Sequence, residues 1–174
     1  GGTIELHWVS NRLFRDTNAW YHIVFKGDTT QAAQADRFRV YVNGDEETSW
    51  TKNYNISQNV DWGNLIAHTN GDLTISGTES QGQMFDGYMS HVAFVDGQAL
   101  APTSFGEFDS DSPTIWKPID VSGLTFGNNG FYLDFENSLA IQLFSSTSFI
   151  ETKCPPNLFA FASASSQVGP STIT

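Results

Sequence analysis

Alternation of apolar with small or polar residues predicts strands along most of the chain. The clearest stretch runs from Tyr88 to Val95 and lies between the dipeptides Asp86-Gly87 and Asp96-Gly97. Asp-Gly dipeptides favour tight turns, so a β-rich run between two of them predicts one strand with a turn at each end. The segment 99–102 that follows is expected to form a short turn, which packs Leu100 inward and ends at its proline.

The stretch from Trp20 to Phe25 has the strongest strand pattern in the chain. Period-2 alternation gives it two bulky faces, one with Trp20, His22 and Val24 and the other with Tyr21, Ile23 and Phe25. Bulk on both faces predicts a central strand of a sheet. No carboxylate or thiol lies near His22 in the sequence, so we expect a hydrogen-bonded structural histidine rather than a catalytic base or a ligand.

A hairpin is predicted between residues 37 and 50. Asn43-Gly44 supplies the positive φ angles of a type I′ turn, so the strand 37–42 reverses there and 46–50 runs back. A polar, exposed loop is expected at 27–36, just before this hairpin. Further strands are expected at residues 3–9, 73–76 and 131–135, and few stretches show the spacing of apolar residues typical of a helix. The pattern as a whole predicts an all-β fold.

Three consecutive acids, Asp45, Glu46 and Glu47, follow the predicted turn. Paired carboxylates are the catalytic groups of glycosidases, but neighbouring residues of a strand point to opposite faces and cannot flank one bond. We therefore expect these acids to form a solvated hairpin end.

The segment 50–70, which a turn at 70–72 follows, combines aromatic side chains with many Asn, Ser and Thr residues. Exposed aromatic rings stack on pyranose faces, while amides and carboxylates bond sugar hydroxyls, so this composition is typical of a sugar site. The alternative is that these aromatics belong to the core or to subunit contacts. The candidate ligand-binding residues are Trp50, Tyr54, Trp62, Asn70 and Asp72.

Length, charge and cysteine content narrow the function further. The 174 residues fit one domain, and eight Lys and Arg against nineteen Asp and Glu give a net charge of −11. This charge disfavours nucleic acid and anionic membranes as partners. No apolar run approaches the ~18 residues that span a bilayer, so membrane insertion is not expected.

The single cysteine, Cys154, excludes an internal disulfide and a Cys-based zinc site, and its role is not evident.

Three motifs together resemble laminin-G-like domains of the wider concanavalin A-like lectin and pentraxin superfamily. They are FDGYMSHVAFVDGQALAPTSFG at 85–106, RDTNAWYHIV at 15–24 and FRVYVNG at 38–44. The continuation FGEFDSD at 105–111, with WKP at 116–118 and GFYLDF at 130–135, is similar to a narrower branch found in structural proteins of tailed phages, marine ones especially. The resemblance covers roughly residues 14 to 137.

The resemblance implies a two-sheet antiparallel jelly-roll sandwich of the concanavalin A-like type. Relatives carry two or more strands ahead of the point where this sequence starts, so those strands are expected to be missing here and to belong to a longer polypeptide or a neighbouring chain. We expect the domain at 1–137. The apolar and Ser/Ala-rich extension at 138–174 is expected to wrap the domain, to dock on a neighbour or to form a terminal strand.

The resemblance also implies a function: a non-enzymatic interaction module on the surface of a phage virion, in a fibre, tail or capsid. Its expected partners are other virion subunits, as a homo-oligomer, and a cell-surface glycan. One alternative is a purely structural decoration protein. The other is a glycosidase acting on β-glucans, for which Asp134-Phe135-Glu136 is the nearest carboxylate run, although it lacks the third acid of related glucanases.

No cofactor is expected, although some relatives bind calcium. The acids available for calcium are Asp72, Asp86, Asp109 and Asp111, and none forms a recognisable calcium-loop motif. We therefore assign no metal ligand and no catalytic residue.

Overall fold

The protein is described by a computed structural model, which covers residues 8–53, 56–60, 77–78, 83–84, 87–135 and 158–167. Within these ranges the chain is almost entirely β-strand and turn. The described residues include two single-turn 3-10 helices, η1 (Gln34–Asp36) and η2 (Pro102–Ser104). All paired strands are antiparallel, so the expected all-β class is confirmed. No helix in the described part is long and apolar enough to cross a membrane.

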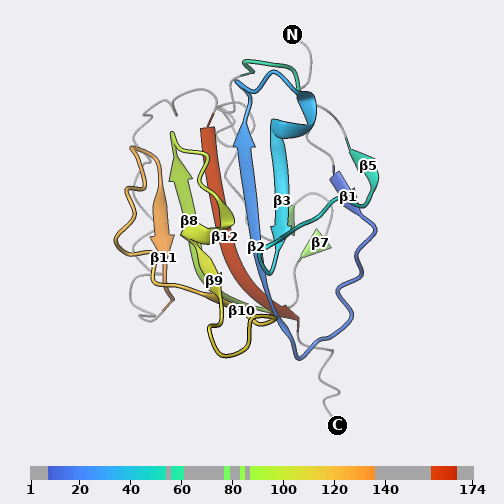
Figure 1. Cartoon of the computed structure of the whole chain (residues 1–174), viewed down its shortest axis with the longest axis vertical. Coiled ribbons are helices and arrows are strands. Elements are labelled where there is room, and N and C mark those ends of the chain that lie inside the picture. The colour runs from blue at the N-terminus through green and yellow to red at the C-terminus, as the bar shows by residue number, and fades with distance from the viewer. Residues whose placement is uncertain are drawn as a thin grey trace.

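A six-stranded sheet forms the centre of the fold, and Figure 1 shows most of its strands side by side. Its order is β11 (Phe131–Leu133), β8 (Gly87–Asp96), β12 (Leu158–Gln167), β2 (Trp20–Asp28), β3 (Phe38–Val42) and β4 (Asp45–Glu46). Strand β12 comes from the expected C-terminal extension and pairs with both β2 and β8. The two strands with the strongest sequence patterns, β2 and β8, therefore both pair with β12, which lies between them.

Three two-stranded sheets complete the described strands. They pair β1 (Trp8–Ser10) with β5 (Trp50–Asn53), β9 (Gly106–Phe108) with β10 (Trp116–Pro118), and β6 (Gly77–Thr78) with β7 (Gln83–Met84). Only the end of the strand expected at 3–9 is described, as β1. The strand expected at 73–76 lies outside the described residues.

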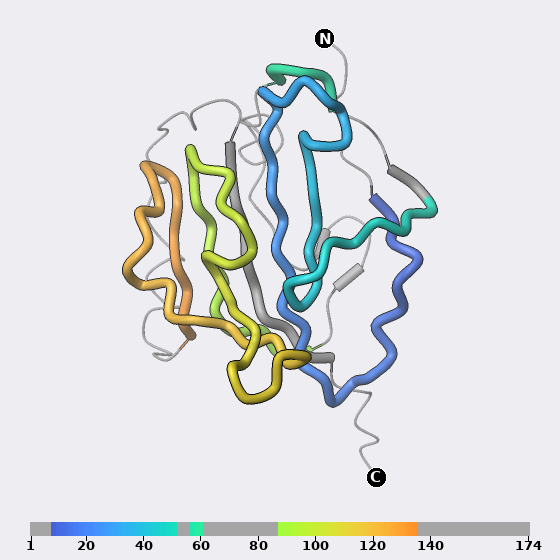
Figure 2. The backbone as a smooth tube through the Cα atoms, viewed as in Figure 1, coloured from blue at the N-terminus to red at the C-terminus, as the bar shows by residue number. Residues whose placement is uncertain are grey.

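Apolar side chains cover both faces of the central sheet, because its inner strands alternate between two bulky rows. On one side, here called the Val24 face, the buried cluster consists of Val24, Ala93, Val95, Phe105 and Val121. The segment 97–130, lime to orange in Figure 2, supplies Phe105 and Val121 and packs Leu100 against this cluster as expected. Here Pro102 begins the helix η2, whereas the sequence suggested that it ends a turn.

The opposite side of the sheet, here called the Val40 face, carries the second cluster. Its buried members are Phe38, Val40, Ile56 and Phe94, and its partly buried members include Trp8 and Trp50 from the β1–β5 pair. The period-2 prediction for β2 is confirmed, since Val24 joins the first cluster while Ile23 and Phe25 join the second.

Strand β8 contains a β-bulge that its sequence pattern does not predict. Its register against β12 shifts between the pairs Ala162↔Ala93 and Ala164↔Ser90, so β8 has one extra residue there. His91 lies at this point with a φ of 53°, in the left-handed region. Such a bulge bends the strand and re-aims its side chains.

The predicted hairpin is confirmed at its turn and wrong in its second strand. Asn43 and Gly44 have φ angles of 52° and 84°, as a type I′ turn requires. The returning strand β4 has only two residues, and Trp50 pairs instead with Ser10 in the β1–β5 sheet. A change of partner sheet depends on distant packing, so the local pattern does not indicate it.

The expected exposed loop at 27–36 is confirmed at residues 30–35 and wrong at its start, where residues 27–29 are buried. Strand β2 continues through Asp28, and Thr29 is fully buried. The guanidinium group of Arg37 is buried beside this segment and donates hydrogen bonds of 2.8 Å to the carbonyl oxygens of Gln31, Ala32 and Ile56. These bonds satisfy the buried charge of Arg37, which lies at the start of the predicted strand 37–42.

Candidate functional site

A cavity of about 330 Å³ lies between the β1–β5 pair and the Val40 face. Its walls are mainly aromatic and aliphatic, with a few polar groups. The lining residues are Trp8, Ser10, Phe14, Ile23, Phe25, Phe38, Val40, Val42, Glu47 and Trp50. The cavity falls at the lower end of the ~300–1,000 Å³ range of small-molecule sites.

Two tryptophans from adjacent strands form one wall of this cavity. The rings of Trp8 and Trp50 meet edge to face, with centroids 4.7 Å apart and planes at 73°. Trp8 also meets Phe38 edge to face at 4.9 Å. Edge-to-face contacts are favourable because the positive ring edge meets the negative face, and they leave other parts of each ring open to a ligand.

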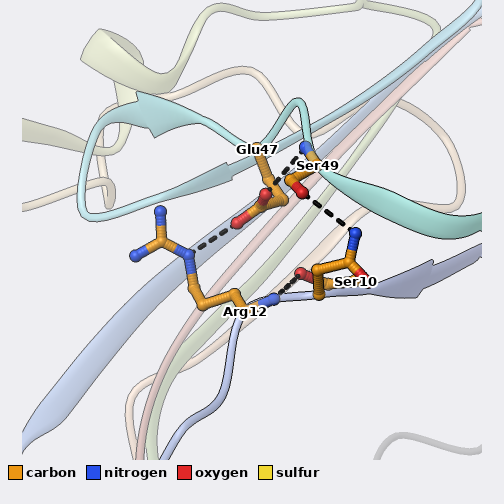
Figure 3. Close-up of polar contacts among 5 residues, drawn as sticks. Ser10, Arg12, Glu47 and Ser49 are labelled. Carbon is orange, nitrogen blue, oxygen red and sulfur yellow. Dashed lines mark hydrogen bonds and ion pairs between the residues drawn. The ribbon is translucent and has the colours of Figure 1, made fainter.

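The polar side of the cavity is formed by a buried carboxylate, Glu47, which is 7% exposed. Arg12 donates from Nε to Oε2 of Glu47 across 2.6 Å, and the backbone N–H of Ser49 donates to Oε1 across 3.0 Å. Figure 3 shows both bonds on the Glu47 side chain. The Arg12 guanidinium, helped by the Ser49 N–H, holds the pKa of Glu47 below its ordinary value of 4.5.

The expectation of a solvated hairpin end is wrong for Glu47, because this side chain points inward at the β1–β5 junction. Glu46 points to the other side and pairs with Arg39 at 2.6 Å. The two carboxylates therefore project to opposite faces, as their adjacency in the sequence predicted. They cannot flank one bond as a glycosidase pair.

Hydroxyl and amide groups continue the polar side of the cavity outward. The side-chain amide of Asn11 donates to the hydroxyl of Ser49 at 3.0 Å, and Thr51 bonds the side-chain oxygen of Asn11. The hydroxyl of Ser10 accepts the backbone N–H of Arg12 at 2.9 Å. Of these short polar residues, Ser10 lines the cavity together with the tryptophan rings and Glu47. Such a site suits a ligand with apolar faces and hydroxylated edges.

Of the five predicted ligand-binding residues, the structure places Trp50 at this cavity. Tyr54, Trp62, Asn70 and Asp72 lie outside the described residues. Sequence reasoning did not consider Trp8, and it set Glu47 aside as part of a solvated hairpin end. The alternating pattern of the first strand was the available signal for Trp8. No local signal marks Glu47, because its partner Arg12 lies 35 positions away.

His22 lies on the Val24 face and is 6% exposed. Its Nδ1 accepts a hydrogen bond of 2.9 Å from the indole N–H of Trp116, so the expectation of a hydrogen-bonded histidine is confirmed. Burial lowers the pKa of His22 to about 4, which keeps the ring neutral at pH 7.

The acids considered for calcium or catalysis are only partly described. Asp109 accepts bonds from the backbone N–H groups of Asp111 and Ser112 and from Lys117. Asp134 is exposed at the end of β11, whereas Asp72, Asp86 and Glu136 lie outside the described residues. Within the described ranges, no three His, Cys, Asp or Glu side chains gather in a way that could hold a metal ion.

Comparison of the chain with protein-family models, with curated proteins and with solved structures finds no match. The function is therefore argued from the site and from the sequence motifs.

Proposed function

We propose that this chain is a non-enzymatic interaction module of a phage virion, displayed on a fibre, tail or capsid surface. It assembles with other virion subunits and attaches to cell-surface glycans through the cavity beside Trp50. The virion assignment is supported by the similarity of the motifs at 105–111, 116–118 and 130–135 to a branch of laminin-G-like domains found in structural proteins of tailed phages. The jelly-roll sandwich is part of the same proposal, supported by antiparallel pairing and by apolar packing on both faces of the sheet.

One observation carries the glycan assignment: the rings of Trp8 and Trp50 lie beside the Glu47 carboxylate in one cavity. A pyranose ring has an apolar face of C–H groups and an edge of hydroxyls. Aromatic rings bind the face, and side-chain oxygens or amides bind the edge. Because Glu47 and Arg12 neutralise each other, the site favours a polar but uncharged ligand over a strongly charged one.

Binding to a glycan array, run with calcium and again with chelator, tests the proposal and finds the ligand. We expect a subset of glycans to bind, and Trp50→Ala to weaken that binding about tenfold or more through loss of ring contact. Ile115→Ala is the matched control, since Ile115 is 57% exposed and does not line the cavity. Circular dichroism of each variant checks that the fold is kept.

Wild-type binding by a folded Trp50→Ala variant would exclude the cavity as the sugar site. If no glycan binds under either condition and native mass spectrometry shows a stable oligomer, the result favours the alternative of a purely structural decoration protein. Release of reducing sugar from β-glucans would instead favour the glycosidase alternative.

A further inference from the structure

Two large aromatic side chains are exposed at one end of the central sheet. Trp20 at the start of β2 is 53% exposed, and Tyr88 near the start of β8 is 63% exposed. Both strands pair with β12, and both residues lie opposite the same β12 residue, Ser166. Figure 1 shows β12 between these two strands.

The pairing places Trp20 and Tyr88 on the same side of the sheet, because directly opposite residues of a ladder project to the same face. Two inter-strand steps separate their backbones by roughly 10 Å. Two positions along β2 from Trp20, His22 belongs to the Val24 face, so the pair lies on that face. The cavity beside Trp50 is on the opposite face, and the two sites are therefore separate.

The aromatic surface continues onto the β9–β10 pair. Trp116 is held by its bond to His22, and Phe108 meets Trp116 edge to face at 5.0 Å. Phe108 is 46% exposed. The surface next to Trp20 therefore adjoins a partly buried tryptophan held by a hydrogen bond, which restrains it and lowers the entropy lost on binding.

The charge of this surface indicates which class of ligand can bind to it. The positions with described side chains that form it, Trp20, Tyr88, Ser90 and Phe108, carry no charge, whereas the whole chain has a net charge of −11. A second copy docked here would bring two strongly acidic chains together, and an anionic ligand would face the same field. A neutral ligand meets no such penalty, and the hydroxyls of Tyr88 and Ser90 suit a hydroxylated one.

We propose that Trp20 and Tyr88 form a second sugar-binding platform, which stacks two rings of one extended, neutral oligosaccharide. A spacing of roughly 10 Å between the two strands lets both aromatic rings contact the same glycan chain. The proposal of this platform rests on the proposed function only in taking a sugar as the class of ligand. Its location on the sheet is independent of the cavity.

The test titrates the full chain with cellohexaose, laminarihexaose and mannohexaose, and follows binding by isothermal titration calorimetry and tryptophan fluorescence. At least one hexasaccharide is expected to bind, and Trp20→Ala and Tyr88→Ala are each expected to weaken it about tenfold. Trp20→Phe and Tyr88→Phe keep a ring and are expected to retain most of the affinity. Leu13→Ala is the control, because Leu13 is 65% exposed and lies on the β1–β2 connection.

The outcomes separate the platform from the cavity. Loss of binding in the Trp20 and Tyr88 variants with normal binding in Trp50→Ala supports the platform and excludes the cavity. The reverse pattern overturns the platform and leaves the proposed function standing. Absence of binding to all three sugars overturns the platform. So does a wild-type dimer that Trp20→Ala converts to monomer in sedimentation velocity, because the occupant is then a second copy.

Discussion

The indole N–H of Trp116 donates a 2.9 Å hydrogen bond to Nδ1 of His22, a residue 94 positions earlier in the chain. This bond ties the β9–β10 pair to the central strand β2. Because Nδ1 accepts, the neutral ring carries its proton on Nε2. Protonation of Nδ1 would place an N–H against the indole N–H, so the contact requires neutral histidine.

Acid is therefore expected to destabilise the fold through His22 before it titrates the carboxylates. Burial lowers the folded-state pKa to about 4 from 6.5, so the unfolded chain binds the proton more readily. The stabilisation is complete above pH 6.5 and is lost as the pH falls towards 4, by about 2 kcal/mol at pH 5 and about 3 kcal/mol at pH 4. Urea unfolding across this range measures the loss.

Two histidine variants isolate this effect. His22→Gln should remove most of the pH dependence between 6.5 and 4, whereas His91→Gln, at an exposed position, should keep it. An unchanged slope in His22→Gln would show that another group is responsible.

A methyl group at Gly44 is expected to disturb the Trp116 contact. Gly44 has a φ of 84°, and a Cβ atom there would overlap the Trp116 ring. Left-handed strain and displacement of the ring together predict that Gly44→Ala lowers the free energy of unfolding by about 2 kcal/mol or more. Gly123→Ala is the control, because nothing lies within 4 Å of the added atom. Equal thermal midpoints for the two variants would refute the prediction.

Arg37 and Arg39 should respond differently to the same substitution. Arg37→Lys removes the planar fork that reaches three backbone carbonyls from a buried position, and we expect a loss of about 1–3 kcal/mol. Arg39→Lys alters half-exposed ion pairs with Asp36 and Glu46 and should cost less than about 1 kcal/mol. Chemical denaturation measures both. A smaller loss at Arg37 than at Arg39 would contradict the assigned roles.

Glu47→Gln is expected to destabilise the β1–β5 junction by about 1–3 kcal/mol, because it removes the charge that Arg12 pairs with at a buried position. The folded-state pKa of Glu47 is depressed, so its stabilisation is present above pH 4.5 and is lost as the pH falls below that value. Glu46→Gln, at a more exposed pair, is the control. Urea titrations at pH 7 and pH 3 measure the difference in unfolding free energy between wild type and Glu47→Gln. A difference at pH 3 as large as the one at pH 7 would argue against this role of Glu47.

Local residue patterns were enough for the all-β class, the two strongest strands and the Asn43-Gly44 turn. Alternation with a period of two, positive-φ residues and Asp-Gly pairs act over a few neighbouring positions, so they can be read without the rest of the fold. The two faces of β2 followed from its period-2 alternation. The hydrogen bonding of His22 was expected because no carboxylate or thiol lies near it in the sequence.

The position of β12 between β2 and β8, the bulge at His91, and the bond between His22 and Trp116 were decided only by the tertiary structure. So was the inward turn of Glu47 towards Arg12. Each depends on segments that lie tens of residues apart, and their pairing reflects which surfaces the whole chain can bury together. Among the predicted sugar-binding residues, Trp50 could be placed because its strand pairs with β1, and that pairing brought Trp8 and Glu47 beside it.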